Sequence, residues 1–284
     1  MIINTRACIS INNRCNLDCL YCHFHTPEKS VYIKKSDMNI FIVLDNIINH
    51  IEKYNIPVFK LGFVGNGEPL LDYASLREYI IYIGDYIADG RISAYTITNA
   101  TLLNAEMLEF FRDYKINAGF SIDGIPEIHN RYRCNTHDTV MNAVEMFRII
   151  NGHYPAMNCT VSRDTISRTE ETIAFFERFG SRVTFSRMIG KNGITLAEFR
   201  KFLDKAESTL NVRRGGYDCT MYGGMCGAGI NNIFYADGKA YICGNCIDLP
   251  ATADYDTPLD MITPDIPTFD RNKCFREIYR GDKY

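Results

Sequence analysis

Three cysteines near the N-terminus stand at the spacing of a metal site. The stretch CNLDCLYC places Cys15, Cys19 and Cys22 within eight residues. A disulfide explains this spacing poorly, because three cysteines cannot all pair and the segment MIINTRACISIN lacks the features of a signal peptide. We therefore expect the three thiolates to bind a metal. Zinc is one alternative, and it would need a fourth ligand, for which His23 and His25 are the neighbouring candidates.

The chain has eleven cysteines, which in a reducing cytosol indicates metal binding or catalysis rather than disulfides. Five of them lie in the last quarter of the chain: Cys219, Cys226, Cys243, Cys246 and Cys274. Cys8 and Cys159 lie in apolar, strand-like stretches, where we expect each to act as a small buried hydrophobic residue. Cys134 stands apart from both groups.

Length and charge restrict the class of protein. A chain of 284 residues with 46% hydrophobic residues suffices for one large α/β domain and a small appendage, which we place at residues 1–210 and 211–284. The net charge of −3 gives no indication of nucleic-acid binding, and no apolar run is long enough to span a bilayer. We expect a cytoplasmic protein.

Strand-like and helix-like stretches alternate along the first 210 residues. Strands are predicted at Ala7–Ile11, Val58–Val64, Ile92–Thr98, Ile116–Ile122, Ala156–Val161 and Val183–Met188. Helices are predicted from Asp37, as the capping residue, to Tyr54, and at Ser75–Ala88, Asn104–Tyr114, Thr139–Ile150, Ser167–Phe179 and Leu196–Thr209. Such alternation favours a parallel sheet with crossover helices, either a partial barrel or an open doubly wound sheet. In both, ligands gather at the carboxyl ends of the strands, where CNLDCLYC falls.

The cysteine triplet resembles the signature of the radical S-adenosylmethionine superfamily, C-x3-C-x2-C with an aromatic residue, here Tyr21, before the last cysteine. The resemblance implies a partial six-stranded (β/α)6 TIM-like barrel over residues 7–190. It also implies a 4Fe–4S cluster with one iron left open to S-adenosylmethionine, which is cleaved to a 5′-deoxyadenosyl radical.

Further segments resemble motifs of the same superfamily. Gly65-Asn66-Gly67-Glu68-Pro69 is similar to its GGEP motif, in which small residues let the backbone approach the ligand and Glu68 is expected to accept from the methionine amino group. The stretch TITNATLL resembles its T-N-G segment, with Asn99 in the site and Ala100 where glycine is common.

The stretch FSIDGIPEIHNRYR resembles an S-x-D-G-x4-H-x3-R segment of the radical enzymes that modify peptides. The match implies that Ser121 lies near the methionine carboxylate, that Asp123 is a catalytic candidate near the site, and that Arg133 is a carboxylate or substrate clamp. For His129 a place in a solvated loop is the preferred interpretation. Asn158 and Thr160 are expected to reach the ribose, whereas Ser186 and Arg187 are weaker candidates, with Arg187 equally able to face outward.

The C-terminal cysteines resemble those of SPASM and twitch extensions. Cys226, Gly238 and Cys243 fit the C-x(9 to 15)-G-x4-C hairpin, predicted to turn at Asp237-Gly238, and Cys219 precedes it by seven residues. The match implies one auxiliary 4Fe–4S cluster, with Cys246 or Cys274 as fourth ligand. The remaining thiol is idle, a substrate contact or a hydrogen-atom donor, the catalytic role that we give Cys246. A structural zinc is the alternative.

Two enzymatic functions fit these motifs. One is modification of a ribosomally made peptide by crosslinking, thioether formation, epimerisation or oxidation. The first strand begins near residue 7, so a peptide-recognition domain is expected from a separate partner protein. The other is oxidation or rearrangement of a small molecule such as a sugar or aminocyclitol. Both require an electron donor such as flavodoxin or ferredoxin. A non-catalytic iron–sulfur or zinc protein is the third possibility.

Overall fold

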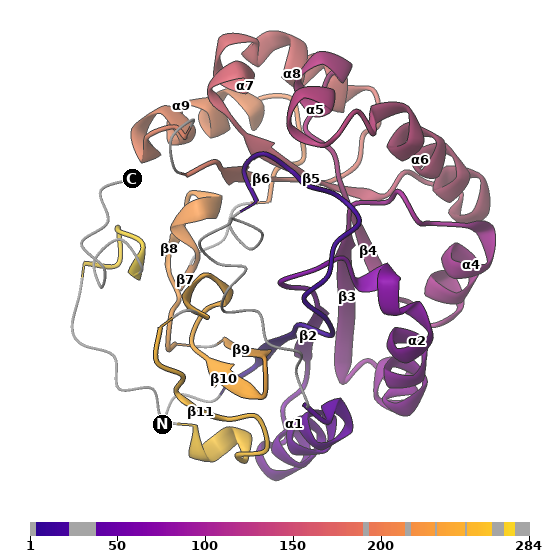
Figure 1. The fold of residues 1–284 in the computed structure, drawn as a ribbon, viewed down its shortest axis with the longest axis vertical. Helices are drawn as coiled ribbons and strands as arrows, with labels where there is room; N and C mark the ends of the chain where they lie inside the picture. The colour runs from indigo at the N-terminus through magenta and orange to yellow at the C-terminus, as the bar shows by residue number, and fades with distance from the viewer. Residues whose placement is uncertain are drawn as a thin grey trace.

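A sheet of nine strands forms the centre of the molecule, with helices along its outer side (Figure 1). The structure is a computed structural model that describes residues 4–22, 38–189, 193–213, 217–230, 232–247, 249–262 and 270–275. Along the sheet the strand order is β11-β10-β9-β1-β2-β3-β4-β5-β6. The α/β class with a parallel sheet is confirmed.

Six parallel strands make up most of the sheet. They are β1 (Arg6–Ile9), β2 (Phe59–Phe63), β3 (Ile92–Thr98), β4 (Asn117–Ser121), β5 (Ala156–Val161) and β6 (Val183–Arg187). In β3 and β5, buried residues alternate with partly exposed ones. One face of each strand therefore packs into the hydrophobic core beneath the helices, and the other face lines the interior of the curved sheet.

The helices form the outer layer. They are α1 (Ile40–Tyr54), α2 (Tyr73–Tyr82), α3 (Gly84–Ala88), α4 (Ala105–Asp113), α5 (Pro126–Tyr132), α6 (His137–Asn151), α7 (Arg163–Ser167), α8 (Thr169–Glu177) and α9 (Leu196–Ala206). Asn39 caps α1 through a hydrogen bond from the Phe41 amide. The predicted cap Asp37 lies outside the described residues.

Two predicted helices are wrong in extent. The stretch Ser75–Ala88 divides into α2 and α3 at Ile83, directly before a glycine that favours helix poorly. Residues 167–179 contain only the second of two helices, because Ser162 already begins α7 with a capping box to Thr165. Helix α5 was not predicted.

The C-terminal segment extends the same sheet along its β1 edge. β9 (Ile233–Ala236) pairs in parallel with β1, and β10 (Lys239–Tyr241) pairs with β9 and with β11 (Ala253–Asp254) in antiparallel fashion. Asp237 and Gly238 have φ values of 50° and 74°, which confirms the predicted hairpin turn. β7 (Tyr217–Asp218) pairs with β8 (Met225–Cys226). The division into domains at residue 210 stays a prediction.

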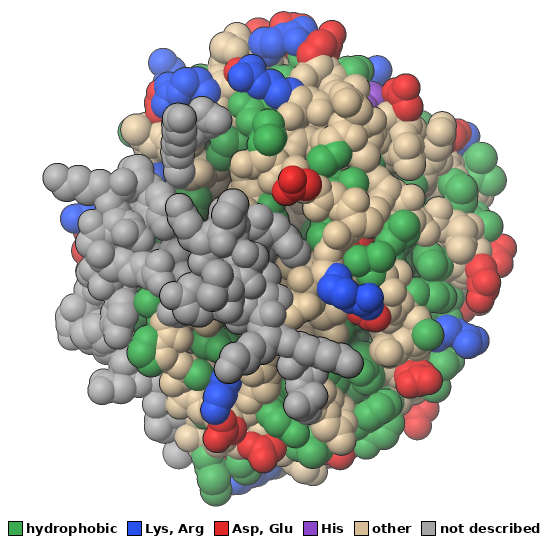
Figure 2. Space-filling view, viewed as in Figure 1, with side chains coloured by type: hydrophobic (Ala, Val, Ile, Leu, Met, Phe, Trp, Pro, Cys, Tyr) green, Lys and Arg blue, Asp and Glu red, His purple; other side chains and the backbone are tan. Residues whose placement is uncertain are grey.

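The described part of the surface carries a mixture of charges. Among the described helices, none has the length and apolar character needed to cross a bilayer. On the described part of the face shown in Figure 2, basic and acidic side chains are interspersed. This distribution agrees with the small net charge of the chain.

Candidate active site

The residues predicted to form one site meet where the parallel strands end. The cysteine loop (residues 15–22) follows β1, Gly65–Pro69 follow β2, Asn99 follows β3 and Asp123 follows β4. The Asn99 side-chain amide donates to Asn16 Oδ1 at 2.8 Å and approaches Cys15 Sγ at 3.9 Å. The end of β3 therefore contacts the cysteine loop directly.

The three thiols of the cysteine loop lie on one short segment, but among the described residues no three Cys, His, Asp or Glu side chains converge closely enough to hold a metal ion. Each of the three thiols is partly exposed, and the Leu17 amide donates to Cys15 Sγ at 3.4 Å. Burial raises the pKa of Cys15 and raises that of Cys19 to about 12, with a contribution from the charge of Cys22 in both cases. Thiols that ionise this reluctantly become thiolates when a cation binds them. His23 and His25 lie outside the described residues.

A fourth thiol, which sequence reasoning missed, contacts the cysteine loop. The Asp18 amide donates to Cys134 Sγ at 3.3 Å. Cys134 has a φ of 56°, in the left-handed region, and it is exposed to solvent. This backbone conformation directly after Arg133 turns the thiol toward the loop. No sequence pattern indicated it.

Asp123 joins the cysteine loop to the ends of two strands. Its Oδ2 accepts from Tyr21 Oη at 2.6 Å and from Arg133 Nε at 2.9 Å, and its Oδ1 accepts from the Thr160 amide at 2.9 Å. Asp123 is fully buried, and the Arg133 guanidinium lies 5.3 Å from the centre of the Tyr21 ring. Burial, the largest single influence, lowers the pKa of Arg133, but the charges of Asp123, Tyr21 and Cys19 and the hydrogen bond to Asp123 together outweigh it, and the pKa is raised. Arg133 is therefore charged, and it forms a buried ion pair with Asp123.

His129 is hydrogen-bonded to the backbone of Asp123 and does not lie in a solvated loop. Its ring is fully buried; Nδ1 accepts from the Asp123 amide at 3.2 Å, and Nε2 lies 3.0 Å from Thr136 Oγ1. Burial lowers the pKa of His129 to about 4, so the ring is neutral. Because Nδ1 accepts, the proton is on Nε2. The preferred interpretation of His129 was wrong; its place six residues after Asp123 was the available signal.

Glu68 is buried beside the end of β3. Its Oε1 accepts from Thr98 Oγ1 at 2.6 Å and from the Leu70 amide at 3.1 Å, and its Oε2 accepts from the Asn99 amide at 2.7 Å. Burial raises the pKa of Glu68 although these donors oppose it. A carboxylate has about four acceptor positions, so Oε2 retains one for a ligand. Its predicted contact with the methionine amino group stays a prediction.

Gly67 makes room for the cysteine loop. A Cβ at this position would lie 2.3 Å from the Arg14 carbonyl oxygen and 2.1 Å from Asn12 Oδ1. The Glu68 amide donates to that same carbonyl at 2.7 Å. The glycine of the GNGEP segment thus allows close approach of the chain before Cys15, where we had expected close approach of a ligand. Asn66 is buried, and its backbone amide donates to Ser10 Oγ at 3.0 Å.

The ends of β4, β5 and β6 present further polar residues. Ser121 and Asn158 are partners in register, and the Asn158 amide lies over Gly119, where a Cβ would be 2.5 Å from Nδ2. The Ser186 hydroxyl donates to the Cys159 carbonyl at 3.4 Å. Arg187 is buried and donates to the Ile194 carbonyl at 3.4 Å. Arg187 thus faces the opposite side of β6 from Ser186.

The C-terminal cysteines form a second group. Burial raises the pKa of Cys219, and the charges of Cys243, Cys274 and Cys226 raise it further. Cys219 and Cys243 each accept from the amide two residues later at 3.4 Å, as Cys15 does. Cys246 lies in an apolar cluster with Cys226, Ala228, Ile242 and Phe275. Its predicted catalytic role stays a prediction.

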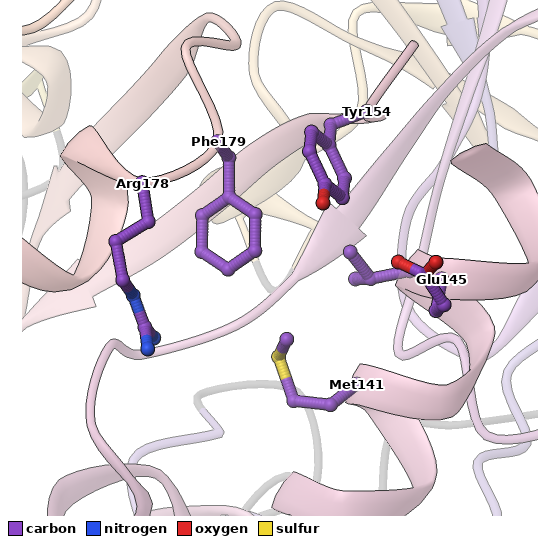
Figure 3. Close-up of a pocket in the computed structure, with 6 residues that line it drawn as sticks. Met141, Glu145, Tyr154, Arg178 and Phe179 are labelled. Atoms are coloured by element: carbon purple, nitrogen blue, oxygen red, sulfur yellow. The ribbon is translucent and has the colours of Figure 1, made fainter. Parts of the chain in front are cut away.

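A surface pocket lies away from these sites. It is lined by residues of α6 and of the segments around Tyr154 and Phe179, among them Met141, Glu145 and Arg178 (Figure 3). It contains none of the predicted site residues.

Comparison with known proteins gives consistent matches. The sequence-family model of the Radical SAM superfamily matches residues 9–206 of the chain. An uncharacterized protein of Methanocaldococcus jannaschii is 28% identical over 207 residues, which are 69% of each chain. The cysteine-type anaerobic sulfatase-maturating enzyme of Clostridium novyi is 25% identical over 172 residues, 59% of this chain and 46% of that enzyme. The present chain therefore spans less than half of the Clostridium enzyme.

A solved structure extends the likeness of fold beyond residue 206. Streptococcus suis SuiB bound to its precursor peptide SuiA superimposes with a TM-score of 0.73 and 15% identity, covering 93% of this chain and 66% of SuiB. At that coverage the shared fold includes most of the C-terminal segment as well as the barrel.

Proposed function

The chain belongs to the radical S-adenosylmethionine superfamily, and we propose that it modifies a ribosomally made peptide. The cofactors of this superfamily, a 4Fe–4S cluster and S-adenosylmethionine, supply when bound a 5′-deoxyadenosyl radical that abstracts a hydrogen atom from the substrate. The following assignments concern what the residues of this chain do toward those cofactors.

One observation carries the assignment of the site: Asp123 and Asn99 tie the cysteine loop to the ends of β3, β4 and β5. In our proposal Cys15, Cys19 and Cys22 hold the cluster, and the remaining acceptor position of Glu68 orients the methionine amino group. Ser121, Asn158 and Thr160 serve the carboxylate and ribose, as their place at the strand ends supports. Arg133 acts on the site indirectly, because its Nε–H donates a hydrogen bond to Asp123.

For the C-terminal cysteines we propose an auxiliary 4Fe–4S cluster held by Cys219, Cys226, Cys243 and Cys274. The electrostatic proximity of Cys219 to the other three supports this choice.

Two relatives support a peptide substrate over a small molecule. The Clostridium novyi enzyme matures a sulfatase, which is itself a polypeptide, and SuiB is bound to a precursor peptide. The proposal includes a low-potential electron donor such as flavodoxin or ferredoxin, and a separate protein that presents the peptide.

The first test measures 5′-deoxyadenosine. The anaerobically reconstituted chain with S-adenosylmethionine and a reductant should form it, and a triple alanine variant of Cys15, Cys19 and Cys22 should not. Equal yields from the two would reject the proposed site. The second test uses a peptide whose gene lies beside the gene of this chain. Loss of two hydrogens from that peptide, or incorporation of solvent deuterium at one of its backbone Cα atoms, would support peptide modification. Modification of a sugar instead would overturn it.

A further inference from the structure

Arg271 attaches the last described segment of the chain to β8, the strand that contains Cys226. Arg271 Nη1 donates to the Cys226 carbonyl at 2.9 Å and to the Ala228 carbonyl at 3.2 Å. The Cys226 amide donates in turn to the Arg271 carbonyl at 2.8 Å. The backbone and the side chain of one arginine therefore both bind the chain at Cys226. The two residues are 45 positions apart, so no local sequence pattern indicated the contact.

The same segment brings a further thiol to the C-terminal group of cysteines. Phe275 is buried in the apolar cluster that contains Cys226. Cys274 lies directly before Phe275. Burial raises the pKa of Cys219 most, and the charges of neighbouring thiols, Cys274 among them, raise it further. Attachment of the segment through Arg271 therefore places Cys274 near Cys219.

A tight turn fixes the spacing between Arg271 and Cys274. Asp270 Oδ1 accepts from the Asn272 amide at 2.9 Å, and the Asp270 carbonyl accepts from the Lys273 amide at 3.0 Å. The turn thus begins at the residue before Arg271 and ends at the residue before Cys274. Because it is closed at both ends, Arg271 cannot shift without moving Cys274.

The sulfur of Cys226 lies among hydrogen-bond donors and near a positive charge. Burial raises the pKa of the Cys226 thiol. The amides of Ala228 and Phe275 donate to the sulfur and oppose this rise, and so does the charge of Arg271. Hydrogen bonds and charges around the ligand sulfurs also set the reduction potential of an iron–sulfur cluster. A positive charge favours the reduced form, because reduction adds one negative charge to the cluster.

We propose that Arg271 is a positioning residue of the auxiliary cluster, which holds Cys274 against Cys226 and raises the reduction potential through its charge. The cluster itself, with Cys219, Cys226, Cys243 and Cys274 as ligands, belongs to the proposed function, so the role of Arg271 rests on it. Arginine suits both tasks, because its guanidinium keeps its charge and presents its donors in a rigid fork.

The test measures the potential of the auxiliary cluster alone. The triple alanine variant of Cys15, Cys19 and Cys22 retains only this cluster, and electron paramagnetic resonance detects its reduced form during a redox titration. Adding Arg271→Gln removes the charge and should lower the ratio of reduced to oxidised cluster at a fixed potential at least threefold. This is a shift of about 28 mV, since a tenfold change is about 59 mV for one electron. Arg271→Lys keeps the charge, so its ratio should remain within twofold of the parent.

Lys273→Gln is the matched control, because it removes an equal charge from an exposed side chain two residues away, where solvent and salt screen it. Its ratio should also remain within twofold of the parent. A purely structural role of Arg271 would lower the amount of bound iron in Arg271→Gln and leave the potential of the remaining cluster unchanged.

An unchanged ratio in Arg271→Gln, or an equal shift in Lys273→Gln, would overturn the inference. If Arg271→Gln binds too little iron for a titration, Arg271→Lys decides. About four iron atoms with the parent ratio would then support the role of Arg271, and loss of iron from Arg271→Lys as well would overturn the role of its charge. Absence of iron from the triple alanine variant itself would instead refute the auxiliary cluster of the proposed function.

Discussion

At the scale of single residues, Asp123 contributes most to the order of the site. It accepts three hydrogen bonds from three different segments, and it is paired with a buried arginine. Removing one partner of a buried ion pair commonly costs about 3–5 kcal/mol, because the other charge is left without compensation. Asp123 therefore holds the cysteine loop in place, a role that its position in the S-x-D-G motif did not distinguish from catalysis.

His129 gives a pH dependence that can be measured. Its pKa is lowered from 6.5 to about 4 in the folded chain, so between these values the unfolded chain binds a proton that the folded chain does not. Its contribution to stability is complete above pH 6.5 and is lost as the pH falls toward 4. We expect this contribution to lower the free energy of unfolding by about 2 kcal/mol at pH 5 relative to pH 7.5.

The measurement is the thermal midpoint of the anaerobic protein at several pH values. His129→Asn keeps an acceptor for the Asp123 amide but cannot titrate, so its midpoint should vary less with pH than that of the wild type. The exposed His153 provides the control, since His153→Asn should follow the wild-type curve. Parallel curves for wild type and His129→Asn would show that His129 does not titrate in this range.

At the scale of elements, the cysteine loop is held between two neighbouring segments. The end of α5 contacts it through the Tyr132 carbonyl, which accepts from the Leu20 amide at 3.1 Å, and through Cys134. On the other side the Gly67 backbone lies against the chain at Arg14. The loop geometry thus depends on residues far from it in the sequence.

Gly67→Ala should displace the cysteine loop. Its Cβ would overlap the Arg14 backbone, which cannot move aside as the end of a side chain can. We expect the purified variant to retain less than half of the wild-type iron at the triplet site. Gly84→Ala is the matched control, since its Cβ would lie 3.5 Å from the Tyr114 ring in ordinary contact. Its iron content should be unchanged; wild-type iron in Gly67→Ala would contradict the predicted displacement.

The sequence predicts the elements better than it predicts the contacts between them. Apolar, strand-like runs identify the six strands β1 to β6, and β3 and β5 match the predicted bounds. The order of strands then places the motifs together at one edge of the sheet. The Tyr95 ring over Gly62 and the left-handed backbone at Cys134 could not be predicted, because they depend on strand register and on loop conformation.

At the scale of the whole molecule, Phe234 packs against both the GNGEP segment and the turn that follows Cys243. A Cβ at Gly65, in the GNGEP segment, and a Cβ at Gly244, next to Cys243, would each lie 2.9 Å from the Phe234 ring. Both glycines thus pack directly on one aromatic side chain. The C-terminal segment is attached to the barrel by this packing and by the pairing of β9 with β1.

The choice between Cys274 and Cys246 is a prediction about the whole chain, because Cys274 lies near the C-terminal end of the described residues. If Cys274 is the fourth auxiliary ligand, Cys274→Ala should lower total iron from about eight atoms per chain toward four, the content of one 4Fe–4S cluster. Cys246→Ala should keep its iron and lose about 1–2 kcal/mol of stability, because it removes a buried apolar group.

The triple variant of Cys15, Cys19 and Cys22 sets the reference, since it should lose the other half of the iron. Limited proteolysis adds a test of structure. In Cys274→Ala the protease should cleave the segment after residue 217 at an earlier time than it cleaves the barrel, because the auxiliary cluster no longer connects the ends of that segment. Iron loss in Cys246→Ala with full iron in Cys274→Ala would reverse the assignment, and it would place the fourth thiolate in the turn that follows Cys243.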